Sequence, residues 1–291
     1  MANYTNEGKK TLLEHAYVEN PTRTKFSKVA IATTDSASTL NVDSEELGFK
    51  APITTTTLIE DGSTINEWST STDAVLEVEQ IINKKGANSF NLYKTGTTES
   101  FASTQRTEIT SFDIDGSEIW LFVYTQSESF SEITDYQVRL GSNIGSDYYE
   151  YTSSITNLSD GWNAVKFSVS DANVVGSPDP TSITGIEVVV NTENASDTIS
   201  SRSFIFDDVK VVNENDFFKQ FVNNFPVVST TQNEVTSRAR IRSTEAVGFN
   251  ISRAGIYNDD QESKLLNYVE FPAESKSDSD EFNLIWRDRV L

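Results

Sequence analysis

The stretch FIFDDVKVV (residues 204–212) is the clearest β-strand in this chain, and it closes a long series of similar segments. Its apolar residues recur at the period of two that an extended strand requires. Strict alternation places Asp208 on the same face as the two phenylalanines. It places Asp207 and Val209 together on the opposite face. We therefore expect a strand that is buried on at least one side.

Further short strands precede this one. They are expected at 74–82, 89–93, 108–112, 118–125, 135–141, 148–153, 164–168 and 185–191. Turn-forming pairs such as Asp115-Gly116 and Gly141-Ser142 separate them, and no helical pattern lies between them. Many short strands with turns at close intervals are typical of a β-sandwich or jelly roll. We expect residues 58–213 to form such a domain.

The sequence on either side has a different pattern. Before the series come a short amphipathic helix at 6–19 and a strand at 26–33. After it come a short helix beginning near residue 215 and strands at 234–242, 247–257, 265–271 and 281–289. We expect residues 1–57 and 214–291 to form one small, mostly β host domain with one or two short helices, interrupted by the jelly roll. The alternative is two sequential domains with an N-terminal arm.

Composition excludes several classes of function. The chain of 291 residues has no cysteine, so disulfides, cysteine-bound zinc and thiol catalysis are excluded. Its single histidine leaves little basis for Ser-His-Asp chemistry, and no glycine-rich phosphate loop is present. We expect a protein that is not an enzyme. No run of 18 apolar residues and no apolar N-terminal core occur, so we expect neither membrane insertion nor Sec export.

The net charge of −21 is concentrated in the middle of the chain. Residues 59–213 contain 24 acidic and 8 basic side chains. Phosphate backbones need a basic surface, so we expect no nucleic-acid binding. The acidic excess is explained either by solubility and salt tolerance or by a cation site.

The middle segment resembles carbohydrate-binding-module jelly rolls of the laminarin- and xylan-binding kind. The matching pieces, in the order of that family, are KGANSFNL (85–92), IWLFVY (119–124), YQVRLGS (136–142), DGWNAVKF (160–167) and FDDV (206–209). The resemblance implies glycan binding. It also implies a structural calcium ion near the first and last strands, for which the acids available are Glu60, Asp61, Glu67, Asp207 and Asp208. The alternative is that these acids stabilise turns.

Sugar binding needs an aromatic face beside hydrogen-bonding groups, because a pyranose presents both C–H patches and hydroxyl groups. The best such collection is Gln137, Arg139, Tyr148, Tyr149 and Tyr151. The alternative is an ordinary mixed sheet surface.

The flanking sequence resembles tailed-virus structural proteins, namely tail-fibre, collar and baseplate-adaptor domains. The matching pieces are YTNEGKKTLL (4–13), TKFSKVAIA (24–32), RARIR (238–242), GFNISRAGIYN (248–258) and FNLIWR (282–287). Arg238, Arg240 and Arg242 alternate and therefore share one face of a strand. They are expected either to protect a sheet edge or to contact an acidic subunit.

These expectations combine into a leading hypothesis. The chain is a virion structural protein of a tailed virus, in the tail, baseplate or collar, assembled in the host cytoplasm. It docks into a symmetric homo-oligomer with other virion proteins and displays a module for host-surface glycans. A capsid decoration or turret protein and a non-viral carbohydrate-binding protein are the alternatives.

Overall fold

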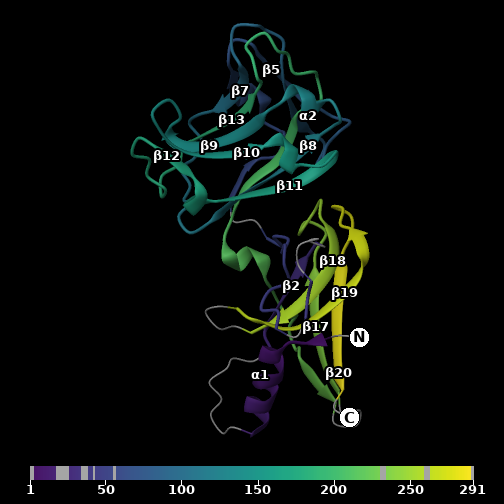
Figure 1. The fold of residues 1–291 in the computed structure, drawn as a ribbon. Coiled ribbons are helices and arrows are strands. Elements are labelled where there is room, and N and C mark those ends of the chain that lie inside the picture. Colours follow the sequence, from purple (N-terminus) through teal and green to yellow (C-terminus); the bar gives the residue numbers. More distant parts are fainter. Residues whose placement is uncertain are drawn as a thin grey trace. The chain divides into compact units, whose positions relative to one another are not determined.

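The structure, a computed structural model, describes residues 3–17, 26–33, 39–41, 43–54, 57–229, 234–258 and 263–289 of the chain. The chain divides into two compact units (Figure 1). The first, called the sandwich below, is Thr55–Asn213, and the second, called the split unit, combines Met1–Thr54 with Glu214–Leu291. Both consist mainly of β-strands, which confirms the mainly β fold class expected from the sequence.

Two antiparallel sheets form the sandwich. The strand order is β12-β10-β9-β13-β7-β4 in the first sheet and β11-β8-β14-β6-β5 in the second, where β3 also pairs with β14. The first sheet contains β4 (Trp68–Thr70), β7 (Phe101–Arg106), β9 (Asp135–Asn143), β10 (Asp147–Ser154), β12 (Asn173–Val175) and β13 (Gly185–Asn191). The second contains β3 (Thr57–Glu60), β5 (Ala74–Glu79), β6 (Ser89–Lys94), β8 (Glu118–Thr125), β11 (Gly161–Ser168) and β14 (Ile205–Val212). The short helical elements are α2 (Ser129–Glu132), η1 (Ile65–Glu67), η2 (Ile155–Asn157) and η3 (Val169–Asp171).

The hydrophobic core lies between the inner faces of these sheets. Val138 and Val188 of the first sheet and Phe90 and Phe206 of the second are fully buried. Trp68 packs edge-on against both phenylalanines, with ring centroids 5.4 and 5.8 Å away. Each such side chain contributes roughly 1.5–3 kcal/mol when it is removed from water. The core therefore determines which residues of each strand face outward.

Strand β14 contains a bulge that changes the expected alternation. Its pairing with β8 shifts register between Asp207 and Lys210, and Asp208 has a φ of 51°. A bulge inserts one residue and moves the following side chains to the other face. Val209 therefore joins Phe206 in the core. The expectation that Val209 lies on the face opposite Phe206 is wrong for this reason.

Strand β7 was not expected from the sequence, because its residues FASTQR are mostly polar. It forms because its backbone pairs with β13 on one side and β4 on the other, so tertiary pairing outweighs local propensity. The segment 108–112, expected as a strand, is instead part of the connection from β7 to β8. It makes one isolated bridge, from Phe112 to Ile183.

The split unit contains two sheets, ordered β1-β19-β18-β2-β15 and β16-β17-β20. In the first of these, β2 precedes the sandwich in sequence and pairs with β18, which follows it, with Ala30 opposite Gly255. The elements are β1 (Asn3–Tyr4), α1 (Asn6–Tyr17), β2 (Lys28–Ala32), η4 (Glu214–Phe217), β15 (Lys219–Gln220), β16 (Val227–Ser229), β17 (Glu234–Ile241), β18 (Asn250–Tyr257), β19 (Leu265–Ser275) and β20 (Phe282–Arg289). Residues 18–19 of the expected helix lie outside the described residues. No described helix is long and apolar enough to cross a bilayer.

Candidate functional site

The outer face of the first sheet presents a row of polar side chains that crosses all of its strands. Residues paired across antiparallel strands point to the same side, so the register defines the row. Because Val138, Val188 and Tyr151 point into the core, their neighbours on each strand point outward. The row, called the polar row below, consists of Ser69, Gln105, Glu187, Arg139, Glu150 and Asn173.

Arg139 lies in the middle of this row and binds its two carboxylates. Its guanidinium donates from Nε to Glu150 Oε2 and from Nη1 to Glu187 Oε2, each at 2.8 Å. Nη2 donates to Gln137 Oε1, also at 2.8 Å. The ring of Tyr148 lies beside it, with its centroid 5.2 Å from the guanidinium carbon. Arg139 therefore fixes two carboxylates of the polar row, and the amide of Gln137 beside it, at the centre of the sheet.

The charge of Arg139 is secured by these partners. Burial by itself would lower the pKa of Arg139, but the hydrogen bonds and charges of Glu187 and Glu150 outweigh it and raise the pKa above its ordinary value. The guanidinium therefore stays charged and remains available to orient both carboxylates.

Two of the five residues expected to bind glycans do not belong to this face. Tyr149 and Tyr151 point into the core, because β10 alternates and its register with β9 turns Tyr148 and Glu150 outward. The hydroxyl of Tyr149 donates to the carbonyl oxygen of Pro178 at 3.1 Å. Tyr151 is 2% exposed. The structure thus brings together Gln137, Arg139 and Tyr148 and corrects the placement of the two buried tyrosines.

Most residues of the polar row were not predicted from the sequence. Glu150 could have been found, because it lies between two inward tyrosines and must point the other way. Gln105 could not, because it lies on β7, which the sequence pattern did not predict as a strand. Glu187 is 48 residues from Arg139 in sequence, and only the pairing of β13 with β9 joins them.

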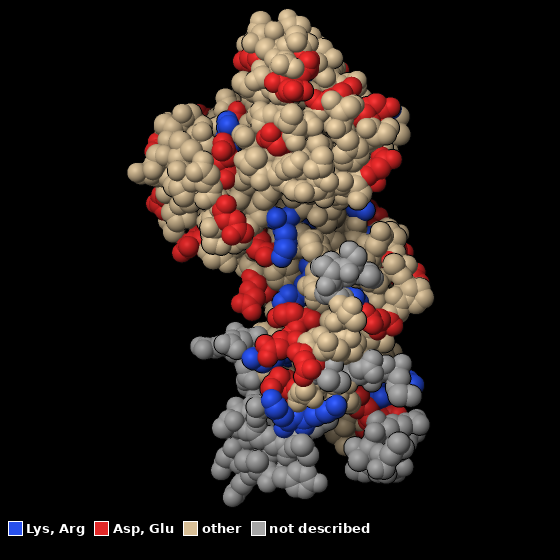
Figure 2. All heavy atoms as spheres, viewed as in Figure 1, with Lys and Arg blue, Asp and Glu red and all other residues tan. Residues whose placement is uncertain are grey.

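Basic groups of the sandwich are engaged within it. Each Lys and Arg of residues 57–213 contacts a carboxylate, a carbonyl oxygen or an aromatic ring, and the set is Lys84, Lys85, Lys94, Arg106, Arg139, Lys166, Arg202 and Lys210. Figure 2 shows carboxylate groups spread over the face of the sandwich that is in view, with few basic side chains among them. The sandwich therefore has an acidic surface.

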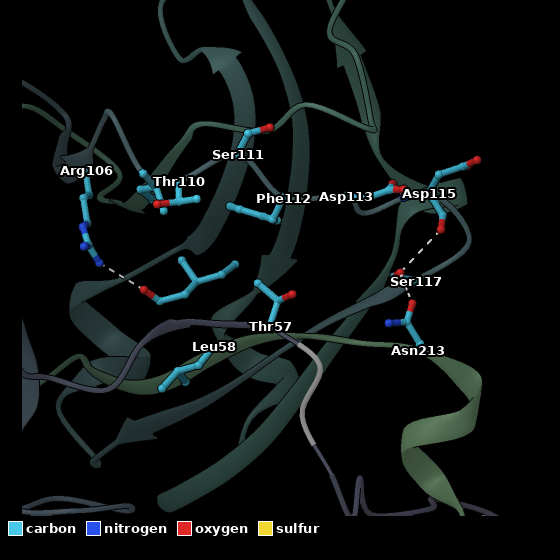
Figure 3. Close-up of a pocket in the computed structure, with 12 residues that line it drawn as sticks. Thr57, Leu58, Arg106, Thr110, Ser111, Phe112, Asp113, Asp115, Ser117 and Asn213 are labelled. Atoms are coloured by element: carbon cyan, nitrogen blue, oxygen red, sulfur yellow. Dashed lines mark hydrogen bonds between the residues drawn. The ribbon is translucent and has the colours of Figure 1, made fainter.

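A second candidate site is a cavity of about 610 Å³ beside β3 (Figure 3). One wall is β3 with Leu58, and another is the connection from β7 to β8, with Thr110 and Phe112. The carboxylates of Asp113 and Asp115 also line the cavity. Its size and its mixture of hydroxyl, carboxylate and apolar groups suit a small polar ligand.

Two of the acids expected to bind calcium, Glu60 and Glu67, are already occupied by hydrogen-bond donors. Glu60 Oε1 accepts from the backbone N–H groups of residues 61–63, and Oε2 accepts from Trp68 Nε1 and Arg106 Nη1 at 3.1 Å each. Glu67 pairs with Arg106. The backbone N–H of Asp61 donates to Glu60 Oε1, and the carboxylate of Asp61 takes no part in this arrangement.

Of the two aspartates of β14, Asp208 is likewise occupied, whereas Asp207 keeps one buried oxygen, Oδ1, without a hydrogen-bond partner among the described residues. Asp208 pairs with Lys85 through Oδ1 and with Lys210 through Oδ2, each at 2.5 Å. Asp207 Oδ2 accepts from the backbone N–H groups of Lys84 and Lys85. Calcium needs six to eight free oxygen ligands. Glu60, Glu67 and Asp208 therefore do not fit it, and no group of three or more His, Cys, Asp or Glu side chains that could hold a metal ion occurs among the described residues.

Arg238, Arg240 and Arg242, which were expected to share one strand face, do not form one row. Arg238 and Arg240 share a face of β17, where Arg238 Nη2 donates to Asn283 Oδ1 at 3.0 Å and Arg240 pairs with Glu281. Arg242 lies beyond the end of β17 at Ile241 and begins a turn, where its backbone N–H donates to Glu245.

No protein-family model matches the chain, and no curated protein matches it either. Solved structures that resemble it include carbohydrate-binding modules. One is a family 11 module from Clostridium thermocellum in complex with a β-1,3-1,4-mixed-linked tetrasaccharide, at 14% identity and a TM-score of 0.41, covering 54% of this chain and 95% of that one. Another is a family 22 xylan-binding domain from Paenibacillus barcinonensis, at 13% identity and a TM-score of 0.33, covering 53% and 97%. A third is an arabinose-bound α-L-arabinofuranosidase, at 14% identity and a TM-score of 0.40, covering 69% and 32%.

Proposed function

We propose that this protein binds glycans, without catalysis, through the outer face of the first sheet. The polar row carries the proposal, because it aligns carboxylate, amide and hydroxyl groups across the whole sheet. The ring of Tyr148 at its side offers an apolar surface for the C–H face of a sugar.

The rigidity of the row supports this function. Arg139 holds Glu150, Glu187 and Gln137 in place before any ligand arrives. A binding surface that is ordered in advance loses less conformational entropy on binding. Weak affinity at each site is sufficient where many copies bind together.

The acidic surface indicates which glycans are suitable. All basic groups of residues 57–213 are engaged internally, so anionic sugars would meet carboxylates without a cation to pair with. Like charges at a binding surface oppose association. We propose that the ligand is an uncharged glycan and that sulfated or uronate-rich chains bind more weakly.

Glycan-array screening of the full-length protein, followed by titration calorimetry, tests the proposal. Gln105→Ala and Tyr148→Ala are each expected to weaken binding about threefold to tenfold, because one hydrogen bond or ring contact contributes roughly 0.5–1.5 kcal/mol. Arg202→Ala, in the turn before β14, removes an ion pair with Glu79 away from the polar row; it is the control and should bind as the wild type does. Binding that Asp113→Ala weakens, and that Gln105→Ala and Tyr148→Ala leave unchanged, would move the site to the cavity beside β3. Absence of any glycan ligand would end the proposal.

A second candidate role rests on the split unit. Its sequence resemblance to tail and baseplate proteins favours a virion component that displays the sandwich. Val227, Val228 and Ile285 are exposed large apolar residues on β16 and β20, as expected of an assembly surface. Stoichiometric copurification with virus particles tests this role, and a monomer found only outside particles would contradict it.

A further inference from the structure

Lys94, at the end of β6, has its charged group buried inside the sandwich and is 1% exposed. Its ammonium donates to the carbonyl oxygens of Gly96, Ala195 and Asp197 at 2.7, 2.8 and 2.6 Å. These contacts use all three N–H donors of the ammonium. They join the turn after β6 to the connection between β13 and β14. The arrangement of carbonyl oxygens around a positive charge resembles the coordination of a metal cation.

Asp73 holds the turn after β6 through a second set of hydrogen bonds. Asp73 accepts hydrogen bonds from the backbone N–H groups of Thr98 and Glu99 at 2.6 and 2.7 Å. A Cβ at Gly96 would come within 1.9 Å of Asp73 Oδ1, so the turn passes close against this carboxylate. Lys94 and Asp73 therefore stabilise the same turn, one by donating to a carbonyl oxygen of the turn and the other by accepting from its N–H groups.

A second group of lysines fastens the segment 80–88 to the outer side of the second sheet. Lys85, from that segment, and Lys210, from β14, both pair with Asp208, which is fully buried. The backbone N–H groups of Lys84 and Lys85 donate to Asp207 at 2.9 Å each. Both oxygens of Asp208 are therefore occupied by ammonium groups.

The split unit contains a similar lysine. Lys276 is 1% exposed, and its ammonium donates to the carbonyl oxygens of Ser243 and Ser277 at 2.9 and 2.8 Å. A buried lysine whose ammonium donates to backbone carbonyl oxygens therefore occurs in both units.

We infer that buried lysine ammonium groups act as the structural cations of this protein, so that its fold needs no divalent metal. A calcium ion at Asp208 would have to displace two ammonium groups, and one at the Lys94 carbonyls would have to displace a third. The lysine side chains themselves supply the positive charge that a metal ion would otherwise supply. This inference does not depend on glycan binding.

Thermal unfolding of the full-length protein tests the inference. The wild type is expected to melt at the same temperature with EDTA and with excess calcium. Lys94→Ala is expected to lower the melting temperature by several degrees, and methylammonium is expected to restore part of the loss by donating to the three carbonyl oxygens. Tetramethylammonium, which has no N–H group, should restore nothing. Lys166→Ala, which removes an exposed ion pair with Glu118, is the matched control and should change little.

A lower melting temperature in EDTA, or a higher one in calcium, would overturn the inference. So would a Lys94→Ala protein as stable as Lys166→Ala. If Lys94→Ala does not fold, Lys94→Met takes its place in the comparison, because methionine keeps the aliphatic stem of the lysine. Should that variant also fail, the wild-type comparison with and without EDTA decides the question.

Discussion

Replacing Glu60 with alanine tests the interpretation of this residue as a hydrogen-bonding hub. Its carboxylate accepts three backbone N–H groups of the turn after β3, together with Trp68 Nε1 and Arg106 Nη1. Water can replace the carboxylate at the backbone groups of the turn. It cannot easily do so at Trp68, whose ring lies in the core, and Arg106 would lose a largely buried partner.

The size of the effect follows from these losses. A buried donor without a partner costs about 1–3 kcal/mol, and breaking a buried ion pair costs about 3–5 kcal/mol. Part of the ion-pair cost is recovered, because Arg106 keeps its contacts with Glu67 and with the carbonyl oxygen of Ile59. We expect Glu60→Ala to reduce the free energy of unfolding by about 3–5 kcal/mol. For a domain of this size that is a fall of roughly 10 °C in melting temperature.

Differential scanning calorimetry of the full-length protein, with Asp61→Ala as control, measures this effect. Asp61→Ala keeps the backbone N–H that Glu60 accepts, so it should change the melting temperature by less than about 2 °C. The reasoning is refuted if the two variants melt alike. It is also refuted if Glu60→Ala changes only the response to calcium.

Three further predictions concern buried polar groups. Burial raises the pKa of Asp207 to about 6. The contribution of this residue to stability is therefore present below its unfolded pKa and is lost as pH rises through about 6. Relative to Asp207→Asn, the wild type should lose up to roughly 3 kcal/mol of unfolding free energy between about pH 4 and pH 7 in denaturant titrations. Tyr151 Oη has no hydrogen-bond partner among the described residues, so Tyr151→Phe should leave the melting temperature unchanged or raise it, whereas Tyr149→Phe should cost about 1 kcal/mol through the lost bond to Pro178. Asp208→Ala should destabilise the sandwich by about 3–5 kcal/mol, because it leaves Lys210 buried without its carboxylate; a loss no larger than that of Lys166→Ala would contradict this.

The candidate site was only partly predictable. Gln137, Arg139 and Tyr148 were expected in the site and lie on one face. Alternation along a single strand, a local property, puts Gln137 and Arg139 together, whereas Tyr148 joins them through the pairing of β10 with β9. Tyr149 and Tyr151 were assigned to the same site because the sequence does not tell which side of β10 is covered by the other sheet. Gln105 was missed because β7 has the composition of a loop and becomes a strand only between β13 and β4.

The amino-acid sequence alone determined that this chain is mainly β and that its middle forms a sandwich, because period-two alternation and turn residues act over a few neighbouring positions. Tertiary structure decided which face of each strand is buried. The bulge at Asp208 turned Val209 inward, and the β9–β13 pairing brought Glu187 to Arg139. It also decided that the acids around β14 pair with lysines. Contacts between residues far apart in sequence depend on register, and no local pattern contains that information.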